Sequence, residues 1–228
     1  MNVMNQKLTM GSSSMDRQVV TNFNASSLVG SDLAGVTAHK GQFKGSALSG
    51  SDFSGADMTG STFRGSDVRE ANFDGANLTD CSLSTLDLTN ASFNKTILVR
   101  TDFSKSGLGG TKFTDVRLTD VTLTMTDLRE TIFEGCLFEG VDFSNSDLSG
   151  KSFDGQTFIG VKFEKAALTD VSFKGAALRN VSFHPGFTLT KKYFRMIQTI
   201  RFDGATMDKL TFAALKGMDA DLSNVTVV

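Results

Sequence analysis

One period dominates this sequence: an apolar residue recurs every five positions from Phe23 to Phe183 without a break. Of the 33 positions in this frame, sixteen are Phe, fourteen are Leu, and the other three are Ala38, Met58 and Val68. The residue two places before each of these centres is mostly small or β-branched, and Asp or Asn often precedes the centre, as in SDFSG and ANFDG. A period of five fits neither an α-helix nor a single β-strand. It favours a coil in which each side is one short unit.

A 20-residue circuit sorts the centres into four columns, which we call the first to fourth sides and which begin at Phe23, Leu28, Leu33 and Ala38. Phe occupies seven of the nine centres on the first side and seven of the eight on the third. Leu occupies seven of the eight centres on the second side. Phe therefore lies on two opposite sides, with Leu on the sides between. A period of ten alone would also permit other polygons with an even number of sides, so the pattern favours a square without requiring it.

These units resemble the pentapeptide-repeat family, whose pattern is Ala-(Asp/Asn)-Leu-X-X centred on Leu or Phe. The resemblance covers 165 residues in one frame. It implies an all-β fold, a right-handed quadrilateral parallel β-helix (a solenoid). The 33 units make about eight turns, and we expect a short C-terminal helical cap. The centre and the small residue should point inward and the other three residues outward. At about 4.8 Å between stacked strands the rod is roughly 40 Å long, and its stability is close to a sum over neighbouring turns.

We expect three parts: a flexible leader at 1–18, the β-helix at 19–184, and a C-terminal segment at 185–228. The leader is polar and lacks the apolar core of a signal peptide, and no stretch is long and apolar enough to span a membrane. The two cysteines are too few for a disulfide framework. We therefore expect a protein of the reducing cytoplasm, with no membrane partner.

The regular frame stops at His184-Pro185-Gly186, and the tail begins with a helical pattern. A helix starting near Thr188 or Thr190 is predicted by five apolar residues at helical spacing: Leu189, Tyr193, Met196, Ile197 and Ile200. A β-helix needs its open end covered, so these residues either only cap the rod or also pair two copies. The resemblance favours a homodimer, because many family members pair through C-terminal elements.

After the helix, the tail returns to repeat-like sequence in a shifted frame. Phe202 and Met207 centre two such units, and ADLSN at 220–224 looks like a final one. The stretch from a Thr206 cap to Gly217 could instead form a second helix.

Three inward positions depart from the pattern. Lys151 and Gln156 occupy consecutive small positions, where a long polar side chain is costly without partners. A widened turn whose polar heads reach an end of the rod or the solvent is one interpretation, and a functional pocket is the other. Leu86 is also oversized for its place, and local repacking explains it.

Chemical motifs are nearly absent, and we predict no enzyme and no catalytic, cofactor or metal site. His39 and His184 lie about seven turns apart, and the sequence has no P-loop, dinucleotide fingerprint, CxxC or HExxH motif. Rows of aspartates such as Asp52, Asp57 and Asp67 favour local turn hydrogen bonds over cation binding. Cys81 and Cys136 fill small inward positions and should be buried, unreactive thiols.

The outer surface carries the remaining functional information. A net charge of −2 gives no global field that would attract nucleic acid. The second side carries a net charge of −5, because Arg69 and Arg129 oppose seven acidic residues. These candidate partner residues are Asp67, Glu70, Asp87, Asp127, Glu130, Asp147 and Asp170. The fourth side carries outward apolar residues, which are either scattered or a patch for a protein partner: Ile97, Val99, Leu137 and Ile159.

The sequence thus favours a non-catalytic, rod-like binding or scaffold protein that presents a surface to an unidentified protein partner. The family resemblance supplies an alternative, because some members mimic DNA, bind DNA gyrase through an acidic surface and confer quinolone or toxin resistance. A 40 Å length of B-DNA displays roughly 23 charges, so one side at −5 is a weak imitation. The uninterrupted frame also lacks the mid-coil loop that some quinolone-protecting members use.

Overall fold

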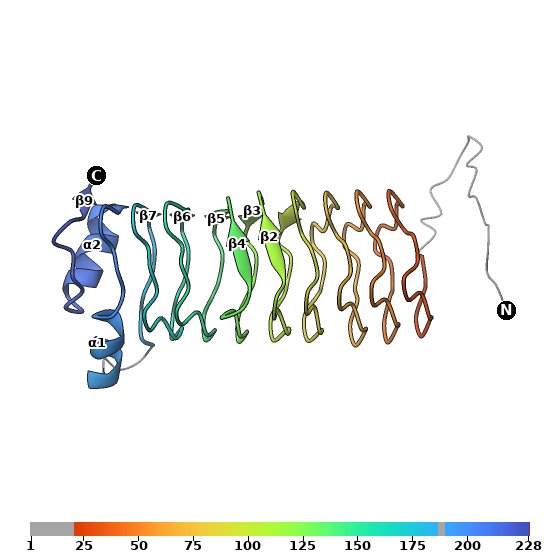
Figure 1. The fold of residues 1–228 in the computed structure, drawn as a ribbon, viewed down its shortest axis with the longest axis horizontal. Helices are drawn as coiled ribbons and strands as arrows, with labels where there is room; N and C mark the ends of the chain where they lie inside the picture. Colours follow the sequence, from red (N-terminus) through yellow and green to blue (C-terminus); the bar gives the residue numbers. More distant parts are fainter. Residues whose placement is uncertain (1–20, 187–189) are drawn as a thin grey trace.

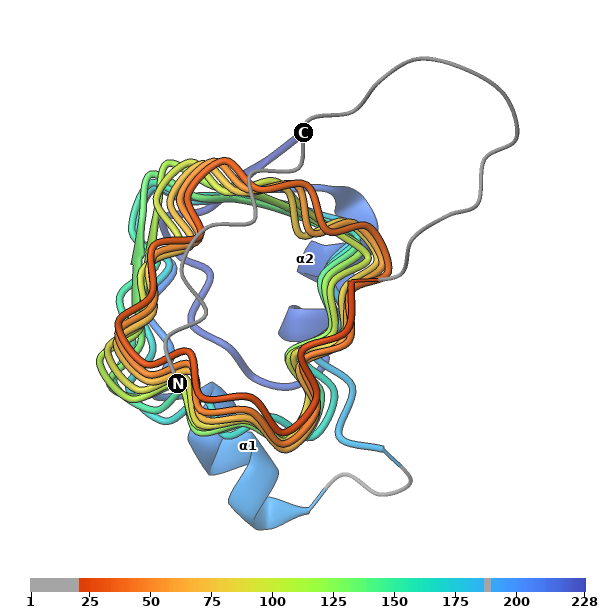
Figure 2. The ribbon, with the colours of Figure 1, turned by 90° about the vertical axis from the view of Figure 1, so that its right-hand side faces the viewer.

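The computed structural model describes residues 21–186 and 190–228, so the leader expected at 1–18 lies outside the described residues. The described chain winds into a straight rod (Figure 1) whose cross-section is a square (Figure 2). Each side of the square is one five-residue unit, and we call one 20-residue circuit a coil. The quadrilateral β-helix expected from the five-residue period is therefore confirmed.

Every unit repeats one local structure. In the interior of the rod, the centre and the small residue two places before it are buried, whereas the other three positions reach the surface. The N–H of a centre donates to a carbonyl of the next coil, as Phe53 does to Asn72 at 2.7 Å. The fifth residue turns the corner with a positive φ, which is 63° at Gly55 and 60° at Asn90. Gly and Asn adopt this left-handed region at low cost.

Strands form where pairing between coils extends beyond a single bridge. On the fourth side seven parallel strands pair in the order β1-β3-β5-β6-β7-β8-β9. Their bounds are β1 Leu98–Val99, β3 Arg117–Thr119, β5 Leu137–Glu139, β6 Thr157–Ile159, β7 Ala177–Arg179, β8 Thr206–Met207 and β9 Thr226–Val227. On the third side β2 (Lys112–Thr114) pairs with β4 (Ile132–Glu134). Elsewhere, parallel bridges join residues twenty positions apart, except that Ser172 pairs with Arg201.

The two Phe columns form the core. Within a column the rings stack with nearly parallel planes, as Phe53 does on Phe73 with centroids 5.1 Å apart and planes 4° apart. Between columns the rings meet edge to face, as Phe53 and Phe63 do at 5.9 Å and 89°. Both arrangements are favourable for aromatic quadrupoles. Every Phe centre from Phe43 to Phe183 is more than nine-tenths buried.

Many of the small inward residues also hold successive coils together by hydrogen bonds, which the sequence pattern did not reveal. The hydroxyl of Thr111 donates to the carbonyl of Leu88 at 2.8 Å, and that of Thr101 donates to Leu78 at 2.8 Å. The thiol of Cys81 makes the equivalent bond to Met58 at 2.9 Å. In these units the side chain of the polar inward residue donates a hydrogen bond to the backbone carbonyl 23 positions earlier.

Lys151 and Gln156 make contacts of the same kind with longer side chains. Gln156 Nε2 donates to the carbonyl of Phe133 at 3.1 Å, and Lys151 Nζ donates to the carbonyl of Thr131. The Phe133 and Phe153 rings lie 6.0 Å apart and 39° from parallel, so the coil is locally widened as expected. The expectation that both heads reach an end or the solvent holds for Lys151, which is partly exposed near Asp127 and Glu130, and is wrong for Gln156, whose amide lies within the coil. Leu86 is buried without any break in the frame.

At the C-terminal end a helix interrupts the coil. Helix α1 (Lys191–Ile197) begins after Thr190, whose hydroxyl accepts the N–H of Tyr193 at 3.2 Å. It lies outside the square (Figure 2). The rod then resumes in the shifted frame, since Phe202 stacks on Phe173 at 5.6 Å and Met207 pairs with Leu178. The predicted helix and the two shifted units are therefore confirmed.

Helix α2 (Lys209–Lys216) lies at the C-terminal end of the rod and covers part of its open square (Figures 1 and 2). The expectation of a Thr206 cap is wrong, because Thr206 belongs to β8 and Asp208 caps the helix. Asp208 Oδ1 accepts the N–H groups of Leu210 at 2.8 Å and Thr211 at 3.1 Å. A final unit at 220–224 follows, and β9 pairs with β8.

Candidate protein-interaction surface

Four aspartates of the second side lie in one column on the outside of the rod. Parallel bridges join Asp67 to Asp87 and Asp127 to Asp147, and Gly107 lies in the same column between these two pairs. Each carboxylate also accepts the N–H two residues ahead, as Asp87 does from Thr89 at 3.0 Å. The local turn therefore fixes the direction of every carboxylate in the column.

Two arginines join these aspartates into matched clusters. Arg69 Nη2 lies 2.6 Å from Asp67 Oδ2, and its Nε lies 3.9 Å from Asp87 Oδ2. Arg129 repeats the arrangement three coils later, at 2.6 Å from Asp127 and 3.6 Å from Asp147. We call these the first and second Asp–Arg–Asp clusters. The hydrogen bond from each arginine lowers the pKa of Asp67 and of Asp127. Because these pairs are exposed, they add little stability but fix a charge pattern.

A groove of about 390 Å³ lies where the second cluster meets the coil that separates the two clusters. It is lined by Gly107, Leu108, Gly109, Asp127, Arg129 and Glu130. Leu108 is buried, and the outward positions of this unit are all glycine. We call the surface of Gly107, Gly109 and Gly110 the glycine notch. Its backbone is accessible where other units carry side chains.

Lys151 brings an additional positive charge to the second cluster. Burial lowers the pKa of Lys151, while the nearby carboxylates of Asp127 and Glu130 act in the opposite direction. Adding this charge changes the net charge of the second side from −5 to −4. A count by sequence unit assigns Lys151 to the third side and therefore overstates the negative charge of the second side.

The other candidate partner residues lie at corners of the rod. Glu70, Glu130 and Asp170 are exposed there. The N–H of Asp170 donates to the Thr199 hydroxyl at 2.8 Å, which ties this corner to the segment after α1. The structure thus unites four aspartates in one column and leaves Asp170 beside the tail.

The candidate dimer and cap residues of α1 and the segment after it contact the rod of the same chain. Ile197 and Ile200 are buried, and Met196 Sδ accepts the N–H of Leu168 at 3.2 Å. The hydroxyl of Tyr193 donates to the carbonyl of Phe183. These four residues therefore pack against their own rod, whereas Leu189 lies outside the described residues. Pairing of two copies stays a prediction.

The apolar residues of the fourth side do not form a continuous patch. Ile97 is 50% exposed, whereas Val99, Leu137 and Ile159 are partly buried. Arg117 lies between Ile97 and Leu137 in the same column, and its guanidinium pairs with Glu139 at 2.6 Å. A charged pair thus interrupts the apolar surface.

The groups with reactive chemistry have local partners. His39 Nε2 lies 2.8 Å from Asp57 Oδ2, and His184 Nδ1 accepts the N–H of Gly186 at 3.1 Å. Cys81 and Cys136 are buried and unpaired, as predicted, and burial raises their pKa values to about 12 and about 11. Within 21–186 and 190–228 no group of three or more His, Cys, Asp or Glu side chains could hold a metal ion. No helix in that part of the chain is long and apolar enough to cross a membrane.

Three family models match this repeating sequence: "Pentapeptide repeats (8 copies)" over 21–55, "Pentapeptide repeats (9 copies)" over 43–85 and "Pentapeptide repeat region" over 86–158. The chain belongs to the pentapeptide-repeat family. No curated protein matches this pentapeptide-repeat protein in a sequence search.

Solved structures of other pentapeptide-repeat proteins share the fold. One is HetL of the cyanobacterium Nostoc sp. strain PCC 7120, described as involved in the regulation of heterocyst differentiation. It is 21% identical, has a TM-score of 0.60, and the match covers 82% of this chain and 84% of HetL. Another is trypsin-treated QnrB1, a plasmid-mediated fluoroquinolone resistance protein, at 18% identity and a TM-score of 0.53. That match covers 81% of this chain and 96% of QnrB1. Identities this low establish a common fold alone.

Proposed function

We propose that this pentapeptide-repeat protein is a non-catalytic, rod-like binding or scaffold protein of the cytoplasm that presents its second side to a protein partner. The observation that carries the proposal is the pair of matched Asp–Arg–Asp clusters with the glycine notch between them. The rod fixes the spacing of these features, because each cluster is attached to stacked coils with a buried core.

The geometry suits a partner with basic side chains. Adjacent coils are about 4.8 Å apart, so the two clusters repeat at roughly 14 Å along the rod. Asp87 and Asp127 flank Gly107 in the column, and Glu130 lines the groove beside it. A lysine or arginine of a partner would find carboxylates on both sides of the notch. Such complementarity chiefly determines association rate and specificity.

Charge removal with retained geometry tests this proposal. Changing Asp67, Asp87, Asp127 and Asp147 to Asn removes four charges but keeps an oxygen that accepts the turn N–H. The matched control changes Asp32, Asp52, Asp102 and Asp142 to Asn, because they make the same turn bond on other sides. We expect immobilised wild-type and control rods to retain the same salt-sensitive proteins, and the second-side variant to lose them. Equal retention by both variants would contradict the proposal.

A second candidate function is binding to DNA gyrase, with resistance to quinolones or toxins as the consequence. The acidic column and a fold shared with QnrB1 favour it, whereas the net charge of the side is far below that of DNA. A supercoiling assay at low micromolar protein, with and without a fluoroquinolone, tests it. Inhibition or drug rescue that disappears in the second-side variant supports gyrase. No effect on supercoiling or on the drug refutes it.

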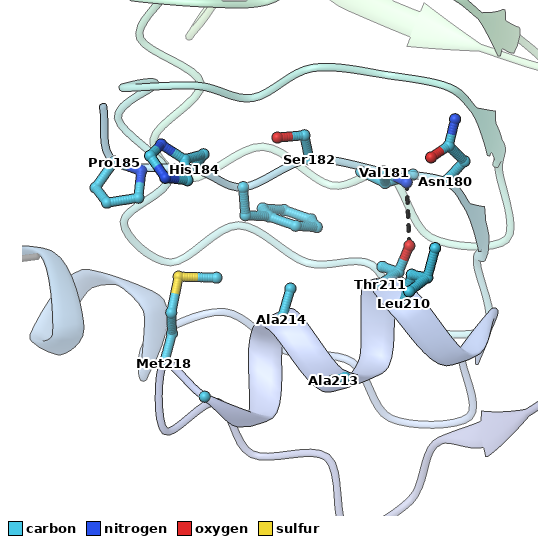
Figure 3. A pocket seen from close by; sticks show the side chains of 12 residues that line it. Asn180, Val181, Ser182, His184, Pro185, Leu210, Thr211, Ala213, Ala214 and Met218 are labelled. Carbon is cyan, nitrogen blue, oxygen red and sulfur yellow. Dashed lines mark hydrogen bonds between the residues drawn. The ribbon is translucent and has the colours of Figure 1, made fainter. Parts of the chain in front are cut away.

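We further propose that two copies pair through α2. A groove of about 470 Å³ separates α2 from residues 180–185 (Figure 3). It contains the small residues Ala213 and Ala214 beside Leu210, which is 77% exposed. A two-fold axis places the same surface on both partners, so Leu210 of each copy would fill the groove of the other. Leu210→Glu should then give a monomer by light scattering, whereas Lys209→Glu should not. A monomeric wild-type protein at 100 µM would refute pairing.

A further inference from the structure

A second groove, of about 560 Å³, lies between α1 and the last unit of the second side. It exists because α1 lies outside the square instead of stacking as the next unit (Figure 2). Its rod side is formed by Ala166, Ala167 and Thr169, and its other walls are formed by Lys165, Pro185, Thr190, Lys192, Tyr193, Arg195, Met196 and Thr199. The volume is in the range of small-molecule sites.

The groove concentrates positive charge in a protein whose net charge is −2. Lys165, Lys192 and Arg195 line it, and no carboxylate does. The acidic column of the second side ends at Asp147, and the next residue in that column is Ala167. Lys192 and Arg195 form no ion pair with any residue in the described ranges. Residues 187–189, which precede α1, carry no carboxylate in the sequence.

Three of the four hydroxyl groups of the groove, those of Thr190, Tyr193 and Thr199, are already used within the protein. Thr190 accepts the N–H of Tyr193, Thr199 accepts that of Asp170, and the Tyr193 hydroxyl donates to Phe183. Lys192 and Arg195 are exposed and keep their donors for a ligand. A guanidinium can donate two parallel hydrogen bonds to a phosphate, and an ammonium adds a mobile point charge.

We propose that this groove binds a small phosphate-bearing anion, either free phosphate or pyrophosphate or a phosphate ester. Arg195 and Lys192 hold the anionic oxygens, and Lys165 adds positive charge from the rod. The ring of Tyr193 and the side chain of Met196 provide an apolar wall for the rest of an ester. The site is separate from the Asp–Arg–Asp clusters, so it does not depend on the function proposed for them.

Tyr193 provides a direct measurement, because it is the only tyrosine and the chain has no tryptophan. Its emission is followed while inorganic phosphate, pyrophosphate or glycerol 3-phosphate is added, with KCl keeping the ionic strength near 100 mM. We expect a saturable change. Changing Lys192 and Arg195 together to Gln should weaken binding by about tenfold or more. Lys191→Gln, the control on the same helix outside the groove, should change it by less than about twofold.

The comparison of probes identifies the source of the phosphate. Tighter binding of glycerol 3-phosphate than of pyrophosphate assigns the groove to an organic ester, and the reverse order assigns it to the inorganic anion. A change that does not saturate, that sulfate at equal ionic strength reproduces, or that survives in the double variant would overturn the proposal. Circular dichroism and thermal melts of the variants check that the fold is intact, and ³¹P line broadening with wild-type protein gives an independent measure of binding.

Discussion

Phe113 offers the strictest test of how the core is built. Its ring is fully buried, stacks on Phe93 at 4.9 Å and on Phe133 at 5.1 Å, and meets Phe103 edge on at 5.7 Å. Phe113→Asp removes all three ring contacts and places a carboxyl group in an apolar column. We expect the coil to split or unfold at this point.

The expected loss of folding free energy in Phe113→Asp is the sum of two contributions. Truncation of a buried Phe costs about 3–5 kcal/mol. At pH 7 the carboxyl must also be neutralised, and with an ordinary pKa of about 3.9 this costs roughly 4 kcal/mol. The sum of about 8 kcal/mol is comparable to the whole stability of a typical domain and is an upper limit, because local opening can rehydrate the carboxylate.

Thermal and urea melts at two pH values separate these contributions. Burial raises the pKa of the new carboxyl, so the variant should regain stability relative to wild type as the pH falls from 7 to 4. Phe113→Asn, which cannot ionise, should lack this pH dependence. Lys112→Asp, on the exposed face of the same strand, should change stability by no more than about 0.5 kcal/mol. A Phe113→Asp melt equal to that of wild type would refute the stacked-core reasoning.

Three further substitutions or modifications test individual contacts. Thr111→Val keeps the shape of the side chain but removes the hydrogen bond to Leu88, and urea melts should show a loss of about 1 kcal/mol. Asp208→Ala removes the cap of α2 and should destabilise the protein by about 1 kcal/mol. Burial acts to raise the pKa of Asp208, but hydrogen bonds from Thr211, Asn180 and Leu210 outweigh it and lower the pKa from 3.8 to about 2. The stabilisation by Asp208 should therefore be complete above pH 3.8 and lost as the pH falls towards 2, which acid titration of wild type and variant would show. Cys81, whose pKa burial raises to about 12, should resist a thiol reagent at pH 8 in the native protein and react once the protein is denatured.

The regular part of the fold could be predicted from the sequence because one contact repeats in every unit. A centre such as Phe53 packs against the centre twenty residues away in its column, and the same contact recurs at every centre of that column. The period therefore specifies the inward positions, the four sides and the stacking together. The hydroxyl bonds of residues such as Thr111 have the same regularity, but a small residue is compatible with packing alone, so the pattern did not reveal them.

The C-terminal end could be predicted only in part, because it does not repeat. Local spacing was sufficient for α1 and for the units around Phe202 and Met207. The N–H of Asn180 donates to Asp208 Oδ2, 28 residues later in the chain. No local pattern distinguishes this cap from one at Thr206. Local sequence also fails to place the charge of Lys151, because its unit belongs to the third side while its charge contributes to the second.

Aspartates alone do not mark the side proposed to bind a partner, because Asp52 and Asp102 make the same turn bond on other sides as Asp87 does on the second. Glycine at 107 and 109 is more informative. Neither residue has a positive φ, and a Cβ would meet nothing closer than 3.7 Å at Gly107 and 3.5 Å at Gly109. The fold therefore accepts a side chain at both positions, and the open notch needs another explanation.

Filling the notch without changing charge tests whether a partner uses it. Changing Gly107 and Gly109 together to Gln should leave stability unchanged or raise it by up to about 1 kcal/mol, since glycine loses the most backbone entropy on folding. If the partner's basic side chain enters the notch, the variant should lose the salt-sensitive proteins that wild type retains. Retention equal to that of wild type would show that the clusters act without the notch. A loss of stability would instead show that these glycines serve the coil itself.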